Sequence, residues 1–197
     1  MEPATPAPPA EDALAMNVLI RRLVVGFVLL LAGVLLVYSL ASEPLAVVSR
    51  AFVDRFGLLG VFVGCMLIDA TPGLTHEPVL LFALEGGLGY GLVFAAAGSG
   101  STLSGLVGYG MGRLLGRNSR VQGMLDRYRL RAFLNRYGVR AVAVAALTPF
   151  PFAIATWGAG ASGVGLRTVF LGSLFRFPKV FIYLSGIAGV ISFSSGG

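Results

Sequence analysis

The chain has 197 residues, of which 56% are hydrophobic and only 12% are charged, and its mean hydropathy is +0.84. Soluble domains contain about 45 to 50% apolar residues, so the composition excludes a soluble globular protein and predicts an integral membrane protein. The length leaves room for one membrane domain and no second folded domain. The single cysteine, Cys65, excludes an intramolecular disulfide.

The N-terminal segment differs in composition from the rest. Residues 1–17 begin with MEPATPAPPAEDALA, which offers too little apolar surface to bury, so we predict a disordered tail. Residues 18–197 then form a single membrane domain. Within it, residues 23–40 are an apolar run directly behind two arginines, long enough to span about 30 Å of hydrocarbon. We expect a first transmembrane helix there, and leave open its cleavage as a signal peptide.

Two parts of the chain carry similar motifs in the same order, which predicts an internal repeat. The copies span about residues 45–112 and 124–191. A chance resemblance in a chain rich in glycine and phenylalanine is the alternative. The paired motifs are FVDRFG (52–57) with FLNRYG (133–138), Thr71-Pro72 with Thr148-Pro149, and GGLGYGLVF (86–94) with GASGVGLRTVF (160–170).

Each Thr-Pro pair follows its conserved glycine too soon for a complete membrane crossing. Proline removes a backbone donor and bends the preceding residue out of helical geometry, so the chain must turn where protein or water satisfies the freed groups. We therefore predict re-entrant hairpins at 57–87 and 138–160, followed by full spans at 91–112 and 168–191. The expected hairpin breaks are Thr71, Pro72, Thr148, Pro149 and Pro151.

The distribution of arginines predicts the topology. Residues 113–140 contain eight arginines and one acid, whereas residues 43–55 contain two charges of each sign. By the positive-inside rule the segment 113–140 and the N-terminus are cytoplasmic, which makes the two hairpins dip from opposite sides. The expected fold is an all-α integral membrane protein, multi-pass in the plasma (inner) membrane, with an inverted repeat of two opposed re-entrant hairpins plus about three full transmembrane helices.

Glycine-rich stretches in this chain resemble nucleotide-binding loops without the required strand or spacing. A better interpretation is close helix packing, because small residues recur every four positions along one stretch. Membrane topology explains the arginine-rich segment 113–140 better than nucleic-acid binding does. We therefore expect no nucleic-acid partner. We interpret Phe150, Phe152 and Trp157 as packing residues. The small residues are Gly100, Ser104, Gly108, Gly112 and Gly116.

Charged residues stand where membrane-embedded helices are predicted. Asp69 and Glu77 lie in the first hairpin, and Arg176 and Lys179 lie in the last helix. A charge at mid-membrane costs about 2.5 to 3.5 kcal/mol, so these residues should face inward, and one acid should pair with Arg176. The pair is either part of a substrate path or a neutralised structural contact. His76 is either a proton relay or a simple hydrogen-bonded histidine.

Several motifs in order resemble the DedA superfamily, also called the SNARE-associated Golgi or VTT-domain family. They are DATPGLTHE, GYGMGRLLGR, FLNRYG, LTPFPFAIATWGAG and VFLGSLFRFPK. The similarity covers about residues 45–190 and looks closest to the TVP-type branch. It implies movement of lipids between leaflets, as a scramblase or a carrier of polyprenyl phosphate, with important acids in the first hairpin and arginines in the second half.

We therefore expect a membrane lipid translocator, either a scramblase or a flippase, with a polar path between opposed hairpins. The alternative is a proton-coupled secondary transporter of a small solute. An enzyme is not expected, because the sequence has no nucleophile–base pair and no metal-ligand cluster; nor do we expect a cofactor. Expected partners are membrane lipids with anionic headgroups or polyprenyl phosphate, attracted by Arg136 and Arg140. Protons and a second copy of the chain are partners left open.

Overall fold

The computed structural model describes residues 10–118, 122–123, 130–148 and 152–195, which contain helices and no strand. Within this part of the chain, three helical segments are long and apolar enough to cross a membrane. Many large apolar side chains on these segments are exposed, as expected when the surrounding solvent is lipid. The predicted all-α membrane fold is therefore confirmed. The three segments are Glu43–Ala70, Tyr90–Leu115 and Leu166–Phe193.

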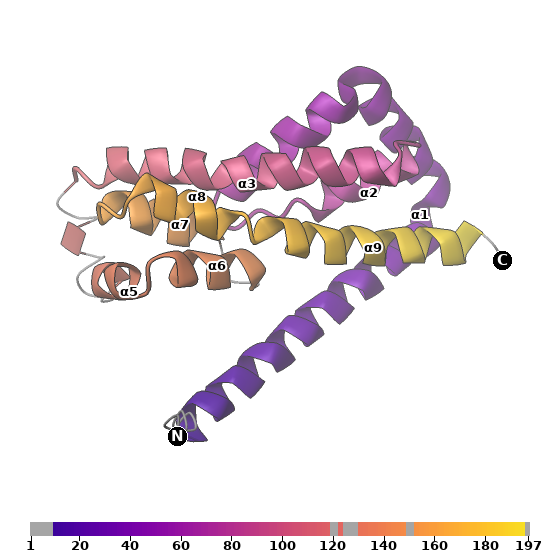
Figure 1. The fold of residues 1–197 in the computed structure, drawn as a ribbon. Coiled ribbons are helices and arrows are strands. Elements are labelled where there is room, and N and C mark those ends of the chain that lie inside the picture. Colours follow the sequence, from indigo (N-terminus) through magenta and orange to yellow (C-terminus); the bar gives the residue numbers. More distant parts are fainter. Residues whose placement is uncertain (1–9, 119–121, 124–129, 149–151, 196–197) are drawn as a thin grey trace, which may run out of the picture.

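Helix α1 (Ala10–Ala70) is a very long helix that changes direction along its length (Figure 1). Pro44 lies inside it, and Gly57 has a φ of +51°, a backbone conformation that glycine adopts without steric cost. The N-terminal part extends away from the other helices, and the part after Gly57 folds back onto them (Figure 1). Residues 23–40 are helical, but the first of the three long apolar segments is Glu43–Ala70, so a membrane crossing at 23–40 stays a prediction.

The start of α1 overlaps the segment that we expect to form a disordered tail. Residues 1–9 lie outside the described part, but α1 already begins at Ala10, within the segment expected to be disordered. The local sequence explains the difference. Alanine and leucine are strong helix formers, and the acidic Glu11 and Asp12 fall in the first turn, where they interact favourably with the helix dipole.

The last turns of α1 and helix α2 (Glu77–Glu85) form a first helical hairpin around residues 71–76. Helix α3 (Tyr90–Leu115) follows and packs against both. Apolar residues of these three helices share a buried core with α9. The core includes Val61, Cys65, Val79, Leu80, Val93, Ala97, Val180 and Leu184.

After α3, the structure gives the bounds of several further helices. They are α5 (Leu130–Tyr137), α6 (Val139–Leu147), α7 (Phe152–Ala161), α8 (Leu166–Ser173) and α9 (Arg176–Ser195). Helices α6 and α7 contact each other as a second hairpin. Pro149 and Pro151, two of the expected breaks, lie outside the described residues, and Thr148 before them is buried.

The backbone repeats at equivalent places in the two halves. Gly57 and Gly138, the last residues of the paired FxxRxG motifs, have φ values of +51° and +48°. Gly87 and Gly163, after the second arm of each hairpin, have φ values of +92° and +76°. Such conformations are rare for other residues. The likeness supports the predicted internal repeat, because distant parts of the chain use the same turns.

The two hairpins enter the fold from opposite ends. Gly86 packs against the backbone of Ser49, so the first hairpin opens where α3 begins; we call this the Gly57 end. Helix α7 runs alongside the second half of α3, with Gly116 against Ala161, so the second hairpin opens where α3 ends. We call that the basic end, because exposed arginines gather there. They are Arg113, Arg117, Arg136, Arg140 and Arg167.

The small residues of α3 allow its backbone to touch its neighbours, as predicted. A Cβ on Gly112 would lie 2.0 Å from the carbonyl oxygen of Trp157, and one on Gly100 would lie 2.2 Å from that of Phe62. From the opposite side, a Cβ on Gly160 would lie 2.1 Å from the carbonyl oxygen of Tyr109. Close backbone approach of this kind is how helices associate where lipid removes the hydrophobic driving force.

The last expected span, residues 168–191, is interrupted. Residues 174–175 form a turn between α8 and α9, and Phe177 donates its backbone N–H to Leu174 O (3.1 Å). Proline at 178 explains the interruption, because it cannot donate to the carbonyl four residues earlier, that of Leu174, and its ring clashes with it. The interruption makes Arg176 the first residue of α9 rather than a mid-helix residue.

Candidate functional site

The site is organised around a buried ion pair between Asp69 and Arg176. Asp69 lies one residue before the end of α1, at the turn of the first hairpin, and Arg176 opens α9. Both side chains are almost completely buried. Burial of either charge alone would cost several kcal/mol, and the attraction between the two charges offsets that cost. Of the two acids that the sequence offered as partners for Arg176, Asp69 is therefore the one in direct contact.

Two further side chains complete the hydrogen bonding of this pair. Ser101 of α3 donates its hydroxyl to Asp69 Oδ2 and accepts a hydrogen bond from Arg176 Nε at 2.7 Å. His76 Nδ1 lies 2.8 Å from Asp69 Oδ1, a distance at which the imidazole donates to the carboxylate. Elements α1, α3, α9 and the first hairpin turn thus meet at one carboxylate.

Arg176 also reaches the second hairpin. Its Nη1 donates to the carbonyl oxygen of Ala146 at 3.5 Å, and its guanidinium carbon lies 4.8 Å from the centre of the Phe152 ring, within cation–π range. Ala146 precedes the second Thr-Pro break by two residues, as Asp69 precedes the first. Arg176 therefore contacts the first hairpin at Asp69 and both arms of the second hairpin, at Ala146 of α6 and Phe152 of α7.

A hydrogen bond from Trp157 also joins the hairpins. Its indole Nε1 donates to the carbonyl oxygen of Ala70 at 3.0 Å. Ala70 ends α1, so this carbonyl has no donor within its own helix. The sequence predicted Trp157 as a packing residue, and this bond adds a polar role.

A cavity of about 230 Å³ lies beside the ion pair. The turn residues that line it are exposed, and the charged residues that line it are buried or half-buried. The cavity therefore runs from the outer surface of the first hairpin turn to the charged cluster. The exposed residues are Thr71, Gly73, Leu74 and Thr75; the deeper ones include Asp69, His76, Glu77, Phe152, Arg176 and Lys179.

Two of the charged residues in the cavity, Glu77 and Lys179, form no ion pair among the described residues. Glu77 is buried, and its Oε2 has no hydrogen-bond partner among the described residues. Lys179 Nζ lies 5.3 Å from the centre of the Tyr183 ring and makes no ion pair with any side chain in the described ranges. His76 Nε2 is likewise buried without a partner there. These groups are available to a ligand, whereas Asp69 and Arg176 are already occupied.

The structure brings together most of the predicted site residues but not all. Asp69, His76, Glu77, Arg176 and Lys179 line one cavity. Thr71 also lines it and donates its hydroxyl to the carbonyl of Leu67 (2.9 Å), while Pro72 is exposed in the same turn. Arg136 and Arg140 are exposed at the basic end, away from this cluster.

Two side chains of the site were not predicted as such. Ser101 stood in a stretch where the small residues were explained by packing alone, and Phe152 was also assigned to packing. A hydroxyl inside an apolar helix was the available signal for Ser101, since such groups bond across helices. Phe152 had no signal in the sequence that separated it from the other phenylalanines. Among the described residues, no three His, Cys, Asp or Glu side chains lie together in a way that could hold a metal ion.

A helical membrane fold with a charged cavity between two opposed hairpins has the general form of a transporter-like membrane protein. The family model of the VTT domain matches residues 74–189, more than half of the chain. The chain therefore belongs to the VTT-domain (DedA/SNARE-associated Golgi protein) family, as its motifs had indicated. The match includes His76, Glu77, Arg176 and Lys179 and begins after Asp69. No curated protein and no solved structure matches the chain.

Proposed function

We propose that this protein moves phospholipid headgroups across the bilayer through the cavity between its two hairpin turns. The observation that carries the proposal is the combination of an exposed outer edge with a deep charged cluster in one cavity. A headgroup can enter such a cavity sideways while its acyl chains stay in the surrounding lipid. At about 230 Å³, the cavity is below the roughly 300 to 1,000 Å³ of pockets for drug-sized ligands and suits a headgroup rather than a whole lipid.

The charges that remain unpaired indicate what the cavity could bind. The ammonium of Lys179 can bind a phosphate, and the free carboxylate oxygen of Glu77 can accept from an amine. Their pairing with a ligand would offset the cost of holding both in the membrane interior. A phospholipid with phosphate and amine uses both residues, whereas a polyprenyl phosphate uses only Lys179.

The proposed path also requires the hairpins to be re-entrant. Its support is that they open at opposite ends of the fold and that Arg176 contacts Asp69 of the first and Ala146 of the second. With the basic end in the cytoplasm, the first hairpin would dip from outside and the second from inside. The N-terminal part of α1 begins on the same side of the view as the basic end (Figure 1), in agreement with a cytoplasmic N-terminus in a plasma (inner) membrane.

The test is lipid exchange in liposomes that contain the purified full-length protein. A fluorescent phosphatidylethanolamine in the inner leaflet should become accessible to an impermeant quencher faster than in empty vesicles. Glu77→Gln should slow this exchange, because the amine loses its carboxylate partner. Glu85→Gln is the matched control, since Glu85 ends the same helix α2 and does not line the cavity.

A second labelled lipid separates the two substrate classes. Lys179→Gln should slow a fluorescent phosphatidylethanolamine and a fluorescent polyprenyl phosphate alike, and Glu77→Gln should slow only the former. Exchange no faster than in empty vesicles would refute the proposal.

One observation favours a second candidate, a proton-coupled carrier of a small solute. His76 connects the Asp69 carboxylate to a buried ring nitrogen that has no partner among the described residues, as a proton relay requires. Proton uptake by liposomes that depends on an added solute, without lipid exchange, would support this candidate in place of the first. His76→Asn should then abolish proton uptake.

A further inference from the structure

Two grooves on the outer surface of the fold have the same composition: each is lined by apolar residues and one arginine. The first, of about 380 Å³, follows one face of α1 across the bend at Gly57. The second, of about 300 Å³, lies between α3 and the start of α8. Each groove has a single charged residue at its edge, an arginine, and Arg167 lines the second groove with the hydrocarbon part of its side chain. The first includes Arg55, Phe56, Leu59, Gly60 and Gly64, and the second Leu106, Leu166, Arg167, Phe170 and Leu171.

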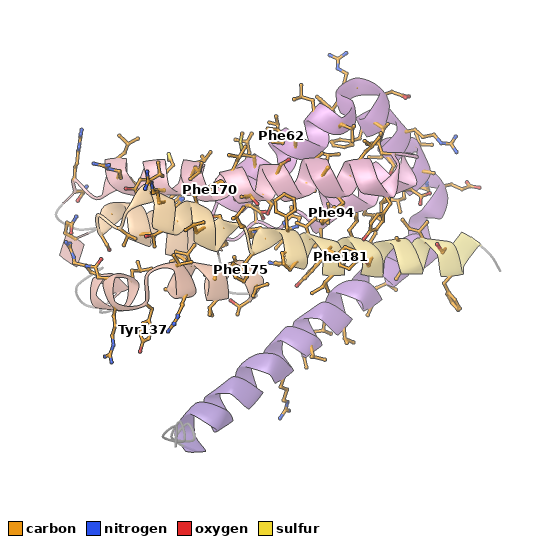
Figure 2. The ribbon with its side chains drawn as sticks, viewed as in Figure 1. Phe62, Phe94, Tyr137, Phe170, Phe175 and Phe181 are labelled. Carbon is orange, nitrogen blue, oxygen red and sulfur yellow. The ribbon has the colours of Figure 1, made fainter. Side chains whose placement is uncertain are left out.

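The arginine stands at the outer end of each groove. Arg55 lies two residues before Gly57, at the Gly57 end, and the apolar residues of its groove continue down the hairpin arm toward the middle of the fold. Arg167 is the second residue of α8, at the basic end, and Phe170 and Leu171 follow it inward. Figure 2 labels Phe170 on this part of α8. The two grooves therefore have opposite directions along the membrane normal.

Neither Arg55 nor Arg167 forms a polar contact within the part of the chain that the structure describes. Both side chains are exposed, and neither makes an ion pair or hydrogen bond with another residue in the described ranges. Snorkelling alone would let an arginine at a membrane surface reach water, but it does not account for an apolar groove beneath each one. Gly60 leaves room for the phenylalanines of the first groove, because a Cβ there would lie 2.3 Å from Phe56 Cβ and 3.2 Å from Phe52 Cζ.

We propose that each groove is a binding site for one phospholipid, with the lipid phosphate on the arginine and an acyl chain in the apolar part. From the membrane surface inward, each groove presents first the arginine and then apolar side chains. A phospholipid presents its phosphate and then its acyl chains in the same order. Because the grooves point in opposite directions, one site serves each leaflet. These lipids are held against the protein and are distinct from a headgroup in the central cavity, so the inference does not depend on translocation.

The charge of the sites favours a lipid with net negative charge. Arg55 and Arg167 each supply one positive charge with no carboxylate in the groove, and guanidinium groups bind phosphate in a bidentate manner. Phosphatidylglycerol should therefore bind at least as well as phosphatidylcholine. Diacylglycerol with the same acyl chains lacks the phosphate and should bind poorly.

Native mass spectrometry of the purified full-length protein can count bound lipids directly. With added phosphatidylglycerol, we expect two molecules to be retained more strongly than the rest. Arg55→Gln and Arg167→Gln should each weaken one of them by about tenfold, the effect of losing a charge-assisted hydrogen bond, and the double variant should weaken both. The matched controls are Arg50→Gln and Arg113→Gln, exposed arginines at the same two ends that line neither groove.

A second variant tests the groove separately from the charge. Leu59 is 70% exposed, so Leu59→Trp should fill the first groove without disturbing the core, and it should release one lipid while Arg55 remains. Equal retention by Arg55→Gln and Arg50→Gln, or equal binding of diacylglycerol, would overturn the proposal. So would a dimer that Leu59→Trp dissociates without any loss of lipid, because the groove would then belong to a second copy of the chain.

Discussion

Asp69 and Arg176 form a buried ion pair although 106 residues separate them in the sequence. One residue belongs to the turn of the first hairpin, and the other begins the helix that follows the second. The pair therefore joins the two halves of the chain at the turn of the first hairpin. Ser101 and His76 also form hydrogen bonds with the oxygens of the Asp69 carboxylate. These bonds hold the ion pair in place beside the cavity.

Removal of either partner should strongly destabilise the fold. Asp69→Asn leaves the Arg176 guanidinium buried without a counter-charge, and breaking a buried pair in this way costs about 3 to 5 kcal/mol. In detergent, the unfolding temperature of the purified protein should fall much further for Asp69→Asn than for Asp54→Asn. Asp54→Asn is a change of the same type at an exposed position of α1.

The double variant Asp69→Asn/Arg176→Gln distinguishes pairing from general damage. It leaves no uncompensated charge, so it should be less destabilised than the sum of the single variants, with a coupling of about 0.5 to 3 kcal/mol. Additive losses would contradict a direct interaction.

A pair of glycines on α3 tests the close contact with α7. Gly112→Ala places a Cβ 2.0 Å from the carbonyl oxygen of Trp157, so the helices must separate and the unfolding temperature should fall. Gly110 has no atom within 4 Å of such a Cβ. Gly110→Ala should therefore be neutral or stabilising by up to about 1 kcal/mol, the difference in helix propensity. Equal effects of the two substitutions would contradict the close packing.

Local rules predicted much of the fold. Hydropathy predicted an all-α membrane fold with long spans over 91–112 and 168–191, and the paired motifs located Gly57 and Gly138, which share an unusual backbone conformation. The turn between α8 and α9 was missed, although Pro178 was visible, because the apolar run around it continues without a change of composition. Helix at Ala10 was missed because proline content outweighed the favourable residues that follow.

The site was only partly predictable, for a physical reason. The cost of burying charge identifies which residues need partners, so Asp69 and Arg176 could be selected from sequence. It does not say which acid is chosen, because that depends on the contact between α1 and α9. Ser101 and the Ala146 carbonyl bind Arg176 through tertiary contacts that no local pattern encodes.

Cysteine labelling tests the predicted sidedness. Cys65 is buried, so Cys65→Ala provides a background without other thiols. Asp54→Cys lies at the Gly57 end and Arg117→Cys at the basic end, and both positions are exposed. In intact cells an impermeant maleimide should label the first and not the second, because the arginine-rich end stays in the cytoplasm. Labelling of both from outside would contradict the topology.

The interruption at 174–175 predicts an effect of Pro178 on activity that is opposite to its effect on stability. Pro178→Ala supplies a backbone N–H for Leu174 O, so α8 and α9 can become one continuous helix, in whose interior proline would cost about 3 kcal/mol. A continuous helix would also rotate and shift the start of α9, which moves Arg176 away from its place between the hairpin turns. The variant should therefore unfold at a higher temperature and exchange lipid more slowly in liposomes. Pro44→Ala is the control, since Pro44 lies inside α1 and does not line the cavity: it should stabilise the protein without slowing exchange. Unchanged exchange by Pro178→Ala would show that the turn does not position Arg176 for function.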